Sequence, residues 1–180
     1  GRLAEEKNIQ ELLKLRASLG SRPVTLLLVG DGPDRSRLER VARDLRLEAP
    51  AVIFAGMVSP EEVPEWYRLG DLFVSASSSE TQGLTYIEAL ASGMPALCRA
   101  DPCLAGVIRE GENGWQYRDE ADFRRKLADF IAHPEWREGM SAAARRSVRP
   151  YSVEAFAESV EDIYRQQILR RDRGTQEVSA

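Results

Sequence analysis

Short apolar runs alternate with longer segments of helical periodicity along the whole sequence, and this alternation constrains the fold more than any other feature. Residues 24–29 form the clearest run, almost entirely apolar between Pro23 and Gly30, as expected of a strand buried on both faces. Similar runs predict strands at 51–55, 72–75 and 95–98, and a small irregular stretch at 107–117 that closes the sheet. Helices are predicted at 3–19, 34–47, from 59 through Trp66 and Tyr67, and at 84–92, 121–132, 134–148 and 153–169. This order predicts an α/β fold, a Rossmann-like parallel sheet flanked by helices.

The length of the chain is compatible with one domain. With 180 residues, of which 43% are apolar, it can bury a substantial core. We predict a single domain over 1–169 and a disordered polar tail over 170–180. The sequence starts at Gly1 rather than at Met, and no apolar strand precedes the first helical pattern, so we expect it to be a fragment of a longer chain.

Charge and cysteine content exclude several classes of protein. A formal net charge of −4 argues against nucleic-acid binding, which needs basic residues concentrated on one face. No apolar run approaches the ~18 residues of a membrane-spanning helix, and the N-terminus lacks a signal-peptide pattern. Cys98 and Cys103 have only His133 as a possible further ligand, too few for a structural zinc site. We therefore expect reduced thiols, no structural zinc site and a cytoplasmic protein.

In open parallel sheets, ligands bind where strands end and helices begin, because the first turn of a helix has free N–H groups and partial positive charge. Three loops of this kind are present, at 30–33, 56–59 and 77–85. The third is the most informative. Its Gly83 allows a ligand to approach the backbone closely, and the amides of Leu84 and Thr85 open a helix that can receive phosphate oxygens.

Two glutamates flank this helix start. Glu88 lies about one turn into the helix. Because helical side chains lean toward the N-terminus, its carboxylate can reach back to the start of the helix and bind a vicinal diol there. Glu80 precedes the helix. Both have an alternative explanation: Glu88 has capping-box spacing from Thr85 and could bond the backbone of its own helix, and Glu80 could be a solvated loop carboxylate.

The spacing of these glutamates, within S-E-T-Q-G-L-T-Y-I-E-A-L-A-S-G-M-P, resembles the E-x7-E motif of retaining glycosyltransferase family 4, which has the two-domain GT-B fold. Further elements in the same order are similar to this family: G-R-L with K-N near the start, the G-D-G-P turn, F-A-G and the late G-E-N-G turn. The resemblance covers most of the C-terminal domain and nothing of the N-terminal one. It implies that the chain is the C-terminal, donor-binding half of a GT-B enzyme.

The resemblance also implies a catalytic set of Arg2, Lys7 and Glu80. Arg2 and Lys7 would neutralise the donor diphosphate, which gains negative charge as the glycosidic bond breaks. Glu80 would face the donor sugar. Without the resemblance, both basic residues would be assigned as surface charges.

A larger donor-binding set is implied in the same way. Backbone groups at the helix start would contact the diphosphate, Glu88 would hold the ribose hydroxyls, and residues beside Glu80 would face the sugar. The nucleobase would lie near the loop after the second strand. The full set is Gly32, Met57, Val58, Thr81, Gln82, Gly83, Leu84, Thr85 and Glu88, with no metal ligand.

Two features depart from the family pattern. The apolar strand that normally precedes G-R-L is absent, so we expect the sheet to lack a strand and Arg2 to lie at a mobile terminus. The N-terminal domain, which supplies the acceptor site and commonly a His near the reacting sugar, is absent as well. His133 does not replace that histidine, because it lies in a predicted helix-to-helix turn at the surface.

The implied function is transfer of a sugar from a nucleoside-diphosphate sugar, UDP-glucose-like, with retention of configuration and without a metal or cofactor. The partners would be this donor and the missing N-terminal domain, and the isolated chain is expected to be inactive. The alternatives are a nucleotide-sugar-binding module without transfer activity, or a GT-B-like epimerase or phosphorylase.

The acceptor is unknown, either a lipid or a glycan. The E-x7-E segment together with D-P-C-L and G-V-I is similar to bacterial enzymes that glucosylate diacylglycerol at the inner membrane face. A membrane lipid is therefore a candidate acceptor, and a peripheral position on that membrane face is a candidate location. Trp136 or the basic residues of 170–173 could touch a membrane, although a solvated face is the alternative.

Overall fold

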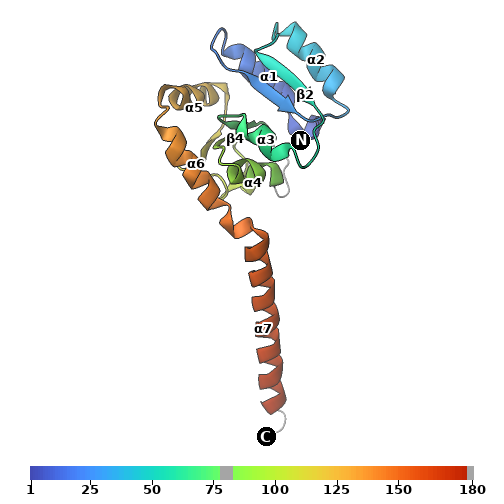
Figure 1. Cartoon of the computed structure of the whole chain (residues 1–180), viewed down its shortest axis with the longest axis vertical. Coiled ribbons are helices and arrows are strands. Elements are labelled where there is room, and N and C mark those ends of the chain that lie inside the picture. Colours follow the sequence, from blue (N-terminus) through green and yellow to red (C-terminus); the bar gives the residue numbers. More distant parts are fainter. Residues whose placement is uncertain (78–82, 178–180) are drawn as a thin grey trace. The chain divides into compact units, whose positions relative to one another are not determined.

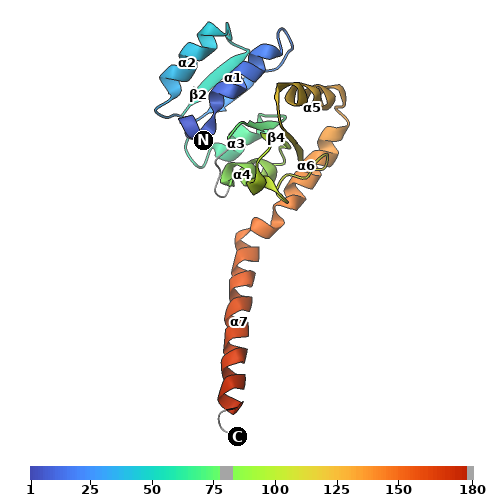
Figure 2. The same ribbon diagram turned by 180° about the vertical axis from the view of Figure 1, so that it is seen from behind.

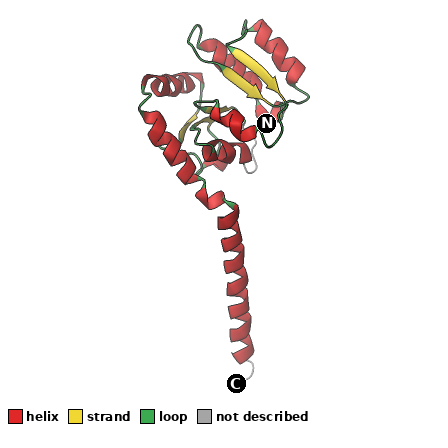
Figure 3. Ribbon diagram, in the orientation of Figure 1, coloured by secondary structure: helices red, strands yellow, loops and turns green. Residues whose placement is uncertain are grey.

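The structure, a computed structural model, describes residues 1–77 and 83–177 (Figure 1). The chain divides into two compact units, Gly1–Ser147 and Val148–Ala180. The first unit contains η1 (Glu5–Lys7), α1 (Ile9–Ser18), β1 (Leu26–Val29), α2 (Arg35–Asp44), β2 (Val52–Gly56), α3 (Val63–Arg68), β3 (Phe73–Ser75), α4 (Leu84–Ala91), β4 (Ala96–Arg99), η2 (Pro102–Leu104), β5 (Gly114–Tyr117), α5 (Glu120–Ala132) and α6 (Trp136–Ser147). Strands and helices alternate as predicted, and the α/β fold is confirmed (Figure 3).

The strands form two parallel ladders rather than one continuous sheet. β1 pairs with β2, and Leu26 lies opposite Val52. β4 pairs with β3 on one side and with β5 on the other. β1 and β3 are thus edge strands of different ladders, and residues of both line one cavity. That a strand is missing from the sheet remains a prediction.

β5 is a regular strand, whereas the sequence predicted an irregular stretch there. It pairs with β4 from Gly114, opposite Ala96, to Tyr117, opposite Arg99. A β-carbon at Gly114 would lie 2.2 Å from the Ala96 carbonyl oxygen, so this close pairing requires glycine. The late G-E-N-G turn therefore ends in a residue that is needed for strand pairing.

Asn113, the third residue of that turn, is fully buried and fastens it. Its Oδ1 accepts a hydrogen bond from the Arg109 N–H at 2.7 Å, and its Nδ2 donates to the Val107 carbonyl at 2.9 Å. Nδ2 also donates to the Ser147 hydroxyl at 2.8 Å. The buried amide thus connects the turn before β5 to the end of α6.

One apolar core joins both ladders. The predicted apolar face of the first helix is buried in it, and α1 and α2 run alongside the β1–β2 pair (Figure 2). Leu97 of β4, Tyr117 of β5 and Phe130 of α5 belong to the same core. The predicted helix over 3–19 is divided into η1 and α1; α1 contributes Ile9, Leu12, Leu13 and Leu15, and Leu3 and Leu19 join the core from outside it.

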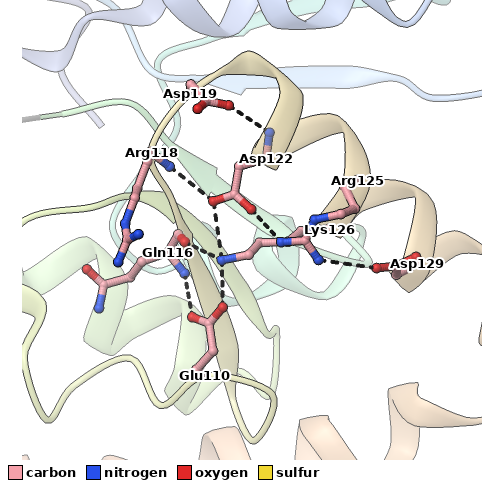
Figure 4. A network of polar contacts seen from close by, with 8 residues as sticks. All are labelled: Glu110, Gln116, Arg118, Asp119, Asp122, Arg125, Lys126 and Asp129. Atoms are coloured by element: carbon pink, nitrogen blue, oxygen red, sulfur yellow. Dashed lines mark hydrogen bonds and ion pairs between the residues drawn. The ribbon is translucent and has the colours of Figure 1, made fainter.

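A polar network connects α5 to β5 (Figure 4). The Lys126 side chain is almost fully buried, and its Nζ lies 2.5 Å from both Glu110 Oε1 and the Gln116 carbonyl oxygen. Asp122 Oδ2 lies 3.5 Å from the same Nζ. The lysine charge is therefore surrounded by acceptors, as a buried ammonium requires.

The second unit contains η3 (Arg149–Tyr151) and α7 (Val153–Glu177), so the last helix continues past its predicted end at Leu169. Its apolar side chains Val153, Phe156, Ile163, Tyr164 and Ile168 are exposed. The predicted domain and tail boundaries remain predictions. In the described part of the chain, no helix has the length and apolar character needed to cross a membrane.

Candidate functional site

The first three residues lie against the turn that follows β1. The Gly1 nitrogen donates to the Val29 carbonyl at 2.7 Å, and the Leu3 N–H donates to the Asp31 carbonyl at 2.9 Å. The Leu3 carbonyl in turn accepts from the Asp34 N–H at 3.0 Å. The backbone on both sides of Arg2 is therefore held, which corrects the expectation that Arg2 lies at a mobile terminus.

A cavity of about 1150 Å³ extends along β1 and β3 to the loops at their carboxyl ends. The predicted site residues Arg2, Lys7, Gly32, Met57, Val58, Thr85 and Glu88 line it. Gly83 and Leu84 are not among its lining residues; Gly83 is buried and Leu84 is 61% exposed. The predicted residues Glu80, Thr81 and Gln82 lie outside the described residues. The structure thus brings together most of the described site residues, and the role of each remains a prediction.

The start of α4 has the geometry of an anion-binding helix terminus. Its N-cap, Gly83, has a left-handed φ of 59° and provides no side-chain cap. The first bond of the helix runs from the Tyr86 N–H to the Gly83 carbonyl at 3.0 Å, so the amides of Leu84 and Thr85 precede it. Thr85 also lines the cavity. First-turn amides of this kind can receive phosphate oxygens.

Glu88 does not cap its own helix. Because α4 begins at Leu84, Glu88 is its fifth residue, whereas a capping box uses the third. Among the described residues, no side-chain hydrogen bond caps α4, and the Glu88 side chain instead accepts a hydrogen bond at Oε2 from the Tyr67 hydroxyl, at 3.1 Å. The capping alternative is therefore wrong, and the exposed carboxylate lines the cavity.

Tyr67 and Trp66 of α3 also line the cavity, although no motif in the sequence predicted a role for them. The Tyr67 hydroxyl lies between α3 and α4, 3.3 Å from the Thr85 carbonyl oxygen as well as beside Glu88. Burial, followed by the neighbouring Glu88 carboxylate, raises the pKa of Tyr67 far above its usual value. The hydroxyl is therefore a hydrogen-bond donor at any physiological pH. Tyr67 lies on a helix between the loops at 56–59 and 77–85, where the sequence predicted ligand binding, and this position is the only sequence signal that could have suggested the contact.

The segment that contains Lys7 is fastened to the carboxyl ends of the strands. Asn8, with a left-handed φ of 48°, donates from Nδ2 to the Ala76 carbonyl at 3.4 Å and to Glu11 Oε2 at 2.6 Å. Glu11 Oε1 accepts from Arg99 at 2.5 Å and from the Tyr117 hydroxyl at 3.0 Å. These bonds connect η1 and α1 to β3, β4 and β5, which fixes the backbone from which Lys7 reaches the cavity.

Over residues 1–77 and the described side chains after 82, no group of three His, Cys, Asp or Glu side chains could hold a metal ion. Cys98 is buried and Cys103 is exposed, and they are not joined by a disulfide.

Comparison with known proteins identifies the family. The family described as Glycosyl transferases group 1 matches residues 1–147, the same span as the first compact unit. The chain belongs to this family. Alpha-monoglucosyldiacylglycerol synthase of Streptococcus pneumoniae is 36% identical over 171 residues, which cover 93% of this chain and 38% of the synthase. The synthase of the same name from Acholeplasma laidlawii is 33% identical over 165 residues, which cover 91% of this chain and 41% of the synthase.

Solved structures agree with this assignment. Sucrose-phosphate synthase of Thermosynechococcus elongatus superposes with a TM-score of 0.81 at 27% identity, over 94% of this chain and 44% of that enzyme. The group 1 chain therefore spans about two fifths of the length of the relatives that it matches. The GT-B fold expected from the E-x7-E segment is confirmed for this part of the protein.

Proposed function

We propose that this chain binds the nucleoside-diphosphate sugar of a retaining glycosyltransferase, with UDP-glucose as the first donor to test. One observation carries the proposal: Lys7, Thr85 and Glu88 line a single cavity although they come from η1 and α4. An ammonium group and first-turn amides are suited to a diphosphate, and a carboxylate is suited to the two hydroxyls of a ribose.

The basic residues would act on the leaving group. As the bond between sugar and diphosphate breaks, negative charge accumulates on the phosphate oxygens, and a cation positioned there stabilises the transition state more than the ground state. Lys7 extends from a segment that Asn8 and Glu11 hold against the strand ends. Arg2 extends from a backbone bonded to the β1–α2 turn. Both would therefore meet the diphosphate from preformed positions, and the proposed step requires no metal or cofactor.

The remaining contacts follow from the lining of the cavity. Met57 and Val58, after β2, would contact the nucleobase, and the Met57 side chain is 79% exposed. Gly32 would contribute backbone at the turn after β1. Glu80, Thr81 and Gln82 would face the sugar, as the E-x7-E motif implies.

The length of the chain favours a second, narrower function: binding of the donor without transfer. The chain covers only 38% and 41% of its two synthase relatives. In a two-domain enzyme, cleft closure brings acceptor and donor together, and residues 1–180 would supply only the donor side. We propose that transfer requires the N-terminal domain of a longer protein.

The relatives also suggest an acceptor and a location. Both synthases are named for a glucosylated diacylglycerol, so a membrane lipid is the acceptor to test before a glycan. Such a protein would work in the cytoplasm, with a peripheral position at the inner membrane face.

Calorimetric titration tests the donor proposal. The chain would be titrated with UDP, GDP and ADP, each alone and with glucose attached, and saturable binding of one base is expected. Glu88→Ala should weaken that binding about tenfold or more while the protein remains folded, because a hydrogen-bonded charged contact to the ribose is lost. A thermal melt of each variant verifies folding.

Glu112→Ala is the matched control. Glu112 is an exposed carboxylate that pairs with Arg109 in the turn before β5, away from the lining of the cavity. Its replacement should leave nucleotide affinity unchanged. If the parent chain binds none of the nucleotides, or if Glu88→Ala binds them as tightly as the parent and Glu112→Ala do, the proposed donor site is wrong.

A further inference from the structure

The hydroxyl of Tyr67 bridges two helices at the edge of the cavity. It comes from α3 and lies 3.1 Å from Glu88 Oε2 and 3.3 Å from the Thr85 carbonyl oxygen, both in α4. Tyr67, Thr85 and Glu88 all line the cavity. Among the hydrogen bonds found in the described part of the chain, this is the one that Glu88 makes through its carboxylate.

The ring of Tyr67 is held in place by other aromatic rings. It packs edge to face on Phe73 of β3, with ring centroids 6.2 Å apart. Phe73 packs in the same way on Tyr86 of α4, at 5.4 Å. The Tyr86 hydroxyl lies 2.8 Å from the Ser75 hydroxyl at the end of β3. The phenol oxygen that meets Glu88 is therefore fixed relative to both helices.

A carboxylate that binds a diol must present its oxygens in one orientation. Glu88 is exposed, and an exposed glutamate rotates about several bonds, so ordering it on ligand binding costs entropy. A hydrogen-bond donor such as the Tyr67 hydroxyl, which already holds one carboxylate oxygen, removes part of this entropy cost before the ligand binds. Oε1 and the remaining lone pair of Oε2 would stay available for ribose hydroxyls.

We propose that Tyr67 is a positioning residue, which orients the Glu88 carboxylate for the ribose of the nucleotide. The inference rests on the proposed function, because it presupposes that Glu88 binds the ribose. In this role Tyr67 acts through Glu88 and not on the diphosphate or the sugar. Its effect should therefore appear only with ligands that carry ribose hydroxyls.

The test compares UDP with 2′,3′-dideoxy-UDP, which lacks both hydroxyls, in the parent and in Tyr67→Phe. The parent should bind UDP more tightly. Tyr67→Phe should weaken UDP binding about three- to tenfold, as expected for one lost hydrogen bond, and should leave the affinity for dideoxy-UDP unchanged. In a Glu88→Ala background, Tyr67→Phe should cause no further loss, because the two residues act as one unit.

Tyr117→Phe is the matched control. Tyr117 also donates its hydroxyl to a carboxylate, Glu11, at 3.0 Å, but neither residue lines the cavity. This variant should keep the parent's ratio of the two affinities, even if its melting temperature falls or both affinities fall together through the segment that carries Lys7. The inference is overturned if Tyr67→Phe leaves UDP binding unchanged or weakens both ligands equally. If the parent fails to discriminate between the ligands, the ribose contact of Glu88 itself is wrong, and the inference fails with it.

Discussion

A β-carbon at Gly32 would lie only 2.3 Å from the carbonyl oxygen of Leu3. The Leu3 N–H donates to the Asp31 carbonyl at 2.9 Å, so the two backbones cannot separate without losing a hydrogen bond. The second glycine of the G-D-G-P turn, Gly32, is thus required because the backbone of Arg2 and Leu3 crosses the turn at this position. Any contact that Gly32 makes with a donor would come in addition to this structural role.

Gly32→Ala should therefore reduce both stability and binding. We expect the free energy of unfolding to fall by about 1–3 kcal/mol, because the added methyl group forces the Leu3 backbone away. Displacement of the neighbouring Arg2 should weaken nucleotide binding in the same variant. Urea unfolding and calorimetry measure the two effects.

The control for this substitution is Gly139→Ala. Gly139 lies within α6, and a β-carbon there would have no atom within 4 Å. Since alanine favours a helix over glycine, this variant should be about 0.5–1 kcal/mol more stable than the parent. If Gly32→Ala were as stable as the parent, the close approach of Gly32 to Leu3 would not exist in solution.

Removal of the buried lysine charge is a second test of the fold. In Lys126→Met, the Gln116 carbonyl and Glu110 lose their ammonium donor, while the volume of the side chain is nearly preserved. Because Glu110 remains 58% exposed and can be hydrated, we expect a moderate loss of about 1–3 kcal/mol in the free energy of unfolding.

Lys14→Met is the corresponding control, since Lys14 is exposed on α1. Its effect should stay within about 0.5 kcal/mol. Equal losses for the two variants in urea unfolding would mean that the network in Figure 4 does not stabilise the junction of α5 and β5.

Asp122 gives a prediction about pH. Burial tends to raise the pKa of this carboxyl, but the hydrogen bond from Arg125, the charge of Lys126 and the Arg118 N–H together lower it. A carboxyl with a lowered folded-state pKa stabilises the fold above its unfolded pKa of about 3.9, and this stability is lost as the pH falls through the folded-state value. Asp122→Asn should therefore lose less free energy of unfolding than the parent between about pH 5 and pH 3. Urea unfolding at each pH measures this difference, and parallel curves would contradict the assignment.

The sequence could predict features that depend on local patterns. The apolar run before Gly30 and the helical spacing of Leu12, Leu13 and Leu15 specify β1 and α1, because periodicity reports which side of an element is buried. The position of Glu88 one turn into its helix likewise predicted that its carboxylate faces a cleft, and the structure has Glu88 in the lining of a cavity, although the ligand remains a prediction.

Contacts between distant segments could not be predicted in this way. Tyr67 meets Glu88 across 21 positions, because α3 and α4 pack around Phe73, and no spacing rule describes that geometry. The regular pairing of β5 depends on Gly114 meeting Ala96 from another strand. The division into two ladders similarly depends on the positions of β1 and β3, which come from distant parts of the sequence and line the same cavity without pairing with each other.

Those two strand edges give a final prediction. Within the described residues, β1 and β3 each pair on one side only, and all residues of both strands line the same cavity. The Gly1 nitrogen already donates to the Val29 carbonyl at the carboxyl end of β1, as the last residue of an added parallel strand would. An extension of about five residues, Val-Leu-Val-Tyr-Val, placed directly before Gly1 should therefore enter the cavity and join the two ladders. Each buried apolar side chain contributes about 1.5–3 kcal/mol, so we expect the melting temperature to rise by at least several degrees.

A Gly-Ser extension of the same length is the control, because it can form the backbone bonds but fills little of the cavity. A second control has proline at the centre of the apolar extension, which removes a ladder donor and should cancel much of the gain. Equal melting temperatures for all three extensions would mean that the cavity between β1 and β3 does not accept a strand.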